Sequence, residues 1–140
     1  MSIKHKIILN YIKDLSVETP DPESLIVARE RISKYGLNLD ITSKPLKNKM
    51  IEVFTKLIYK DKENSKKKTY FEMVHSTVIQ IEEENPIKEE LKKFILCDLQ
   101  IEIYPKIQET FIHILKLSGF PQIKISGKVD FVKLYKERSN

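Results

Sequence analysis

Apolar residues recur at spacings of three and four along most of this chain, which is the pattern of one buried stripe on an α-helix. The first stripe predicts a helix over residues 3–15 and consists of Ile3, Ile7, Ile8, Tyr11, Ile12 and Leu15. A second stripe predicts a helix over residues 43–58 and consists of Leu46, Met50, Val53, Phe54, Leu57 and Ile58. A third predicts a helix over residues 69–84 and consists of Tyr70, Met73, Val74, Thr77, Val78 and Ile81.

Two further helices are predicted from their start and stop signals. Asp21-Pro22-Glu23 has the capping carboxylate, the early proline and the acidic first turn of a helix start, and Gly36 supplies an end. Asn85-Pro86 begins a helix that is apolar on most faces, so we expect it at the centre of the domain. Pro105 should kink or restart that helix, which Gly119-Phe120-Pro121 then ends.

The last 20 residues, 120–140, change character. Alternating apolar residues on both sides of Ser126-Gly127 favour a small hairpin. Asp130 is the alternative signal, because it can cap a short helix that uses Phe131 and Leu134.

The predicted fold is therefore all-α: a single compact domain, residues 1–140, of five to six helices in an irregular bundle, within the size range of globin-like domains. An exposed lysine-rich loop is expected over residues 60–68, which contain no apolar residue.

Composition agrees with one globular domain, since 41% of the 140 residues are hydrophobic and 32% are charged. No apolar run approaches the ~20 residues that span a bilayer. The first residues lack the apolar run and cleavage site of a signal peptide, and the lone Cys97 suits a reducing compartment. We therefore expect a cytoplasmic protein.

The formal charge of +5 raises the question of nucleic-acid binding. Only Arg29, Arg31 and Arg138 are arginines, and a lysine surface lacks the planar fork that reads bases and phosphates best. The candidate basic patch comprises Lys44, Lys47, Lys49, Lys66, Lys67 and Lys68. It predicts weak, salt-sensitive attraction with little sequence preference.

The chemically reactive residues do not form a recognisable active site. Glu109 and His113 are four apart and share a helical face, so we expect a buried hydrogen-bonded pair, not a metal site. One cysteine cannot build a cysteine zinc site, and the three glycines cannot make a phosphate loop. No catalytic, metal-binding or cofactor-binding residue is therefore assigned, and the protein is not expected to be an enzyme.

The leading hypothesis is a non-catalytic regulatory or accessory domain that acts through protein contact, with another protein or with a second copy of itself as a homodimer. One alternative is a helical sensor that encloses an apolar small molecule where Pro105 splays the helices. The other alternative is an accessory nucleic-acid-binding protein that uses the basic patch.

Overall fold

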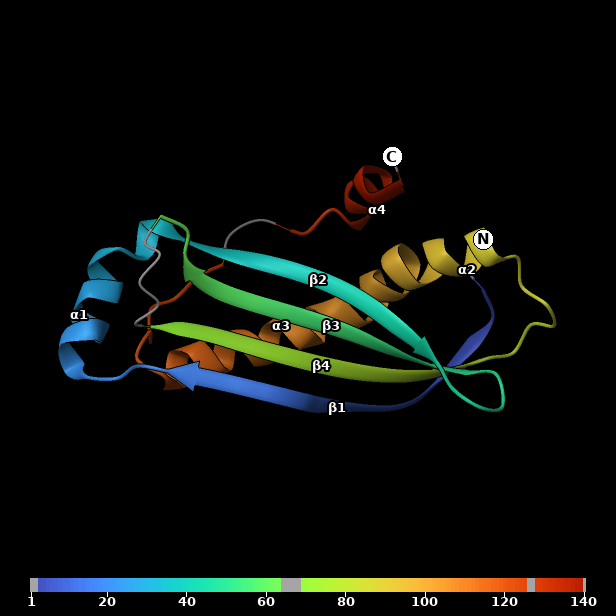
Figure 1. Cartoon of the computed structure of the whole chain (residues 1–140), viewed down its shortest axis with the longest axis horizontal. Helices are drawn as coiled ribbons and strands as arrows, with labels where there is room; N and C mark the ends of the chain where they lie inside the picture. Colours follow the sequence, from blue (N-terminus) through green and yellow to red (C-terminus); the bar gives the residue numbers. More distant parts are fainter. Residues whose placement is uncertain (1–2, 64–68, 126–127, 140) are drawn as a thin grey trace.

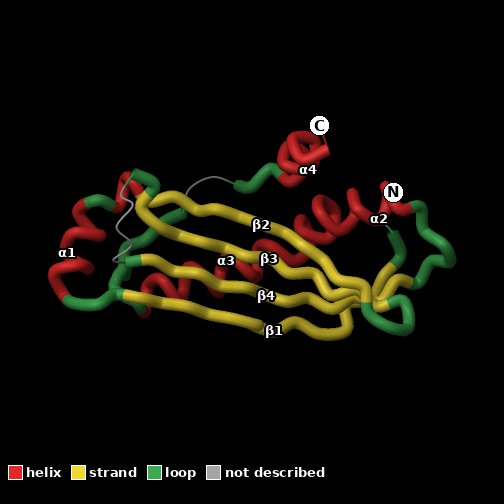
Figure 2. Tube along the Cα trace, viewed as in Figure 1, coloured by secondary structure: helices red, strands yellow, loops and turns green. Residues whose placement is uncertain are grey.

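The protein is built from two layers, a four-stranded antiparallel sheet and a long helix that crosses one of its faces (Figure 1). The computed structural model describes residues 3–63, 69–125 and 128–139. The prediction of an all-α bundle is wrong, because three of the predicted helical stripes lie in strands. The strands lie side by side in the order β1-β4-β3-β2, so that β1 and β2 are the edges of the sheet (Figure 2).

The elements follow one another along the chain with short connections. The strands are β1 (His5–Glu18), β2 (Tyr35–Pro45), β3 (Met50–Asp61) and β4 (Tyr70–Ile81). The helices are α1 (Pro22–Glu30), the 3₁₀ turn η1 (Ile32–Lys34), α2 (Lys88–Lys93), the π-helical segment η2 (Phe94–Asp98), α3 (Leu99–Leu117) and α4 (Phe131–Ser139).

The central strand β3 alternates between a buried face and a half-buried face, whereas β4 is buried on both faces from Ser76 to Ile79. On β3 the fully buried positions include Val53, Thr55 and Leu57, and Leu57 pairs across the ladder with Met73 of β4, which is also fully buried. This face lies against α3, while the opposite face carries half-buried Phe54. Both faces are therefore partly apolar. Two residues that are four positions apart lie on the same face of a strand, as they do on a helix.

The edge strand β1 contains two bulges that change its spacing. The register with β4 shifts between Ile7 and Leu9 and again between Ile12 and Asp14. Each bulge inserts one residue, so some residues on one face are three apart instead of two. This spacing resembles the helical pattern and explains the wrong prediction over residues 3–15.

The predicted helix start at Asp21 is confirmed, since the Asp21 Oδ1 atom accepts a hydrogen bond of 2.7 Å from the Ser24 backbone N–H. The predicted end is wrong, because α1 stops at Glu30 and Gly36 lies inside β2.

The long helical region follows the prediction most closely. Pro105 lies inside α3, and Phe111 and Leu115 of this helix are fully buried against the sheet. A buried hydrogen bond of 3.0 Å, donated by Gln100 Nε2 to Thr55 Oγ1, also joins helix to sheet. Gly119, which has a φ of 113°, follows the helix end as predicted.

The C-terminal segment contains a helix, so the preferred hairpin is wrong and the alternative is correct. Asp130 Oδ1 accepts a hydrogen bond of 3.1 Å from the Lys133 N–H at the start of α4. Phe131 is buried and packs edge-on against Tyr104 of α3, with ring centroids 5.2 Å apart. The expected turn at residues 126–127 lies outside the described residues.

We predict that Gly119→Ala lowers the free energy of unfolding by about 1–3 kcal/mol, because a β-carbon disfavours positive φ. The added atom would also lie 2.8 Å from two carbons of Leu25. Gly36→Ala is the matched control, because its new methyl group meets only the flexible end of Lys62. Urea unfolding of both variants measures the difference, and equal stabilities would contradict the assignment.

We also predict that Tyr104 makes the protein alkali-sensitive. Burial raises the pKa of Tyr104 to about 12, from 10.0. Between pH 10 and 12 the Tyr104 hydroxyl ionises in the unfolded chain but stays neutral in the folded protein. The contribution of this residue to stability is therefore present below pH 10 and falls as the pH rises towards 12.

The Tyr104 hydroxyl has no hydrogen-bond partner among the described residues, so Tyr104→Phe should be neutral or stabilising at pH 7. At pH 11 the variant should exceed the wild type by about 1.4 kcal/mol more than it does at pH 7. Parallel curves of stability against pH would contradict this role.

Candidate functional site

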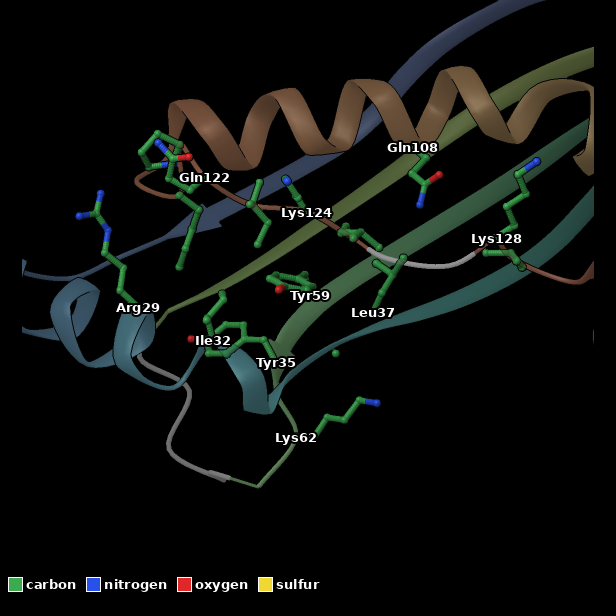
Figure 3. A pocket seen from close by; sticks show the side chains of 16 residues that line it. Arg29, Ile32, Tyr35, Leu37, Tyr59, Lys62, Gln108, Gln122, Lys124 and Lys128 are labelled. Carbon is green, nitrogen blue, oxygen red and sulfur yellow. The ribbon is translucent and has the colours of Figure 1, made fainter.

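A hollow, here called the α1–β2 pocket, lies where the chain after α3 passes the start of β2 (Figure 3). Its volume is about 940 Å³. Its lining comprises Arg29, Ile32, Tyr35, Gly36, Leu37, Tyr59, Lys62, Gln108, residues 120–125, Lys128 and Val129. The pocket thus joins segments that are far apart in the sequence.

Aromatic rings form its base. Tyr35 lies 5.3 Å from Tyr59 and 6.2 Å from Phe120, measured between ring centroids. The Tyr35 hydroxyl donates a hydrogen bond of 2.8 Å to the carbonyl of Thr69, and burial raises the pKa of both tyrosines. They therefore stay neutral at physiological pH, and their rings give the base of the pocket an apolar, aromatic surface, while the lining as a whole exposes about as much polar as apolar surface.

The wall formed by residues 120–125 is held in place at its beginning. The Phe120 N–H donates a hydrogen bond of 3.1 Å to the Leu115 carbonyl at the end of α3, and the Phe120 ring is buried against Phe71, with centroids 5.4 Å apart. Arg29 Nε donates a hydrogen bond of 2.7 Å to the Gly119 carbonyl, which ties α1 to this wall. Ile123 is also buried, whereas Ile125 is half-buried and faces the pocket.

The charged residues at the rim share one sign. Arg29, Lys62, Lys124 and Lys128 line the pocket, and each is exposed. No aspartate or glutamate belongs to the described lining. The pocket therefore combines an apolar base with a cationic border.

A second apolar surface runs along the edge strand β1. Half of the large apolar side chains that are exposed in the described chain belong to this strand: Ile8, Leu9, Tyr11, Ile12, Leu15 and Val17. Edge strands of monomeric proteins are usually guarded by charge or covered, so a 14-residue edge strand with six exposed apolar side chains is a candidate contact surface.

The predicted basic patch is only partly described. Lys44 lies in β2, one residue before its end, and Lys47 and Lys49 lie in the exposed β2–β3 turn, so the helix start that a nucleic-acid interpretation required is absent there. Lys66, Lys67 and Lys68 lie outside the described residues. The β2–β3 turn is at the opposite end of the sheet from α1 and the start of β2 (Figure 1).

The predicted pair Glu109 and His113 lies on α3, but both side chains are exposed and no hydrogen bond joins them. They border a smaller hollow of about 520 Å³ on the outer side of that helix. No metal-binding group of three or more His, Cys, Asp or Glu residues occurs among the described residues.

The remaining reactive side chains are held in unreactive forms. Cys97 is 2% exposed in the π-helical segment, and burial raises the pKa of its thiol. Burial lowers the pKa of His75, which favours the neutral imidazole. These environments suit structural residues, not a nucleophile and its base.

Comparison with known proteins identifies the family of this chain. The family model described as preprotein translocase subunit SecB matches residues 2–140. The chain belongs to the SecB family. The SecB family is non-enzymatic, which confirms the expectation of a non-catalytic protein that acts through protein contact. Among the described residues, no helix is long and apolar enough to cross a membrane.

Several SecB relatives resemble the chain over most of its length. A putative protein-export protein SecB of Pelagibacter ubique is 45% identical over 140 residues, which is all of both chains. The protein-export protein SecB of Bartonella bacilliformis is 24% identical and aligns with 94% of this chain and 81% of its own.

A solved structure shares the fold. The SecB-like chaperone of Mycobacterium tuberculosis, solved in complex with an antitoxin peptide, matches with a TM-score of 0.62 and 12% identity. The match covers 89% of this chain and 90% of that one.

Sequence reasoning missed the α1–β2 pocket because its parts come from four separate segments. Tyr35, Tyr59 and Phe120 each appear as ordinary core residues in a linear pattern. One signal was available in β3, where the buried residues Ile51, Val53, Thr55, Leu57 and Tyr59 alternate without interruption. That alternation indicates a strand and would have placed Tyr59 at its end.

Proposed function

We propose that this SecB-family protein is a cytoplasmic chaperone that holds non-native polypeptides for export, with apolar client segments bound in the α1–β2 pocket. One observation carries the proposal: half-buried Tyr35, Leu37 and Ile125 line a hollow of about 940 Å³. Folded proteins bury most of their apolar residues, so an apolar binding surface distinguishes non-native chains from folded ones.

The shape and chemistry of the pocket suit an extended segment. Its lining runs from α1 along the start of β2 to Val129, and the aromatic base accepts different apolar side chains with little demand for exact shape. The names of the export relatives and the peptide held by the Mycobacterium tuberculosis chaperone support the same kind of client.

We infer a second role for β1, which is pairing with β1 of a second copy. Apolar side chains lie on both faces of this edge: Ile12 and Leu15 pair with β4 residues that face α3, whereas Leu9 and Tyr11 lie on the other face. An antiparallel pair of identical strands is self-complementary about a two-fold axis. Such pairing would join the two sheets into one. It would also bring apolar side chains of the two β1 strands next to each other on both faces of the joined sheet.

We predict that Leu37→Gln and Ile125→Gln each weaken binding of an unfolded client by about tenfold or more, because burial of one large apolar side chain contributes about 1.5–3 kcal/mol. Fluorescence anisotropy with a labelled unfolded protein measures the affinity. Leu117→Gln is the matched control, because Leu117 is 76% exposed and lies outside the pocket. Wild-type affinity in both pocket variants, with unchanged circular dichroism, would refute the assignment.

We also predict that the protein forms dimers or larger assemblies, and that Ile12→Lys with Leu15→Lys shifts it towards monomers. Two buried ammonium groups would oppose pairing of the edges. The control is Ile26→Lys with Val27→Lys, which adds the same charge to exposed residues of α1. Light scattering gives the mass, and a monomeric wild type or an unaltered β1 variant would exclude β1 pairing.

A further inference from the structure

The charge around the α1–β2 pocket narrows the class of client. Resting on the proposed function, we infer that this protein selects apolar segments that are flanked by aspartate and glutamate. The apolar base supplies most of the affinity, and the cationic rim discriminates between flanks of opposite sign. Acidic flanks are therefore favoured and basic flanks are disfavoured.

The four rim cations come from three separate parts of the chain. Arg29 belongs to α1, Lys62 follows β3, and Lys124 and Lys128 lie in the connection between α3 and α4. Figure 3 shows these side chains on different sides of the aromatic base, so that several directions out of the pocket pass a positive charge.

These charges are not neutralised within the described part of the protein. None of the four forms an ion pair there, and Arg29 Nε binds a carbonyl oxygen, not a carboxylate. The two acids on either side of Lys62 in the sequence pair with other cations: Arg31 lies 2.5 Å from Asp61 and 3.6 Å from Glu63, and Lys34 also contacts Glu63. The field at the rim is therefore positive, in a chain whose formal charge is +5.

The expected size of the preference follows from exposed ion pairs. Each contributes about 0.2–1 kcal/mol, so two or three contacts change affinity by roughly tenfold. Like charges on a basic flank act in the opposite sense and widen the difference between clients. A nucleic acid would also be attracted to the rim, but it would leave the apolar base unfilled.

The test uses the full-length protein and three peptides with one apolar core, flanked by Asp/Glu, by Ser or by Lys/Arg. Fluorescence anisotropy at low salt should give the tightest binding for the acidic flanks, about tenfold weaker binding for serine flanks, and the weakest for basic flanks. Higher salt should reduce the differences while the serine-flanked peptide stays bound.

The variant Lys124→Glu with Lys128→Glu should remove most of the difference between the acidic and basic peptides, because it leaves two cations and two carboxylates at the rim. Lys47→Glu with Lys49→Glu is the matched control, since it makes the same change of charge at the β2–β3 turn and should preserve the difference. A fourth peptide with acidic flanks and a serine core should bind poorly.

The results separate the two ideas. Equal binding of the three peptides, or a difference that the Lys124/Lys128 variant does not reduce, overturns the charge selection and leaves the proposed chaperone function standing. Failure of all three to bind overturns both. Tight binding of the serine-core peptide would show a general polyanion site and also overturn the inference. Equally tight binding of an oligonucleotide of matched charge would do the same.

Discussion

The packing of α3 against one face of the sheet is the interaction on which the rest of the structure depends. Phe111 and Leu115 of the helix and Val53, Leu57 and Met73 of the sheet are fully buried in this layer. A single helix covers the middle of a four-stranded sheet but not its edges. Because β1 and β2 are those edges, the apolar residues of β1 and the start of β2 remain available for contact.

The two contact surfaces differ in kind. The β1 edge has a fixed set of side chains on both faces, and fixed geometry suits one repeated partner such as a second copy. The α1–β2 pocket has a soft aromatic base and an exposed border, which suits many related segments. Because burial raises the pKa of Tyr35 and Tyr59, the base stays uncharged, and the sign of the pocket is set at its rim.

The sequence allowed a good prediction where local chemistry determines structure and a poor one where strand pairing does. Asp21 as a helix cap and Gly119 as a helix end were predictable, because each satisfies backbone groups within a few residues. The strands were not, because β3 carries apolar residues such as Phe54 on its second face and β1 has bulges that imitate helical spacing. The helices α1 and α3 were predicted as helices, but they were assigned to an all-α bundle and not to a fold with a sheet.

The function was predictable only by exclusion. Lone Cys97 and the scattered histidines argued against catalysis, and the SecB family agrees with that part of the prediction. The pocket could not be predicted from the sequence, because Tyr35, Tyr59 and Phe120 meet only after the sheet has formed and Phe120 has packed on Phe71. Its rim cations were scattered among 25 basic residues in the sequence.

Hydrogen–deuterium exchange with and without an unfolded client tests the central claim most directly, since it reports every backbone segment at once. The centres of β3 and β4 should exchange slowly in both states, because α3 already covers them. Client binding should slow exchange in Tyr35–Leu37 and Ile123–Ile125, which border the pocket. New protection on the uncovered face around Phe54, with no change in those two segments, would contradict the account.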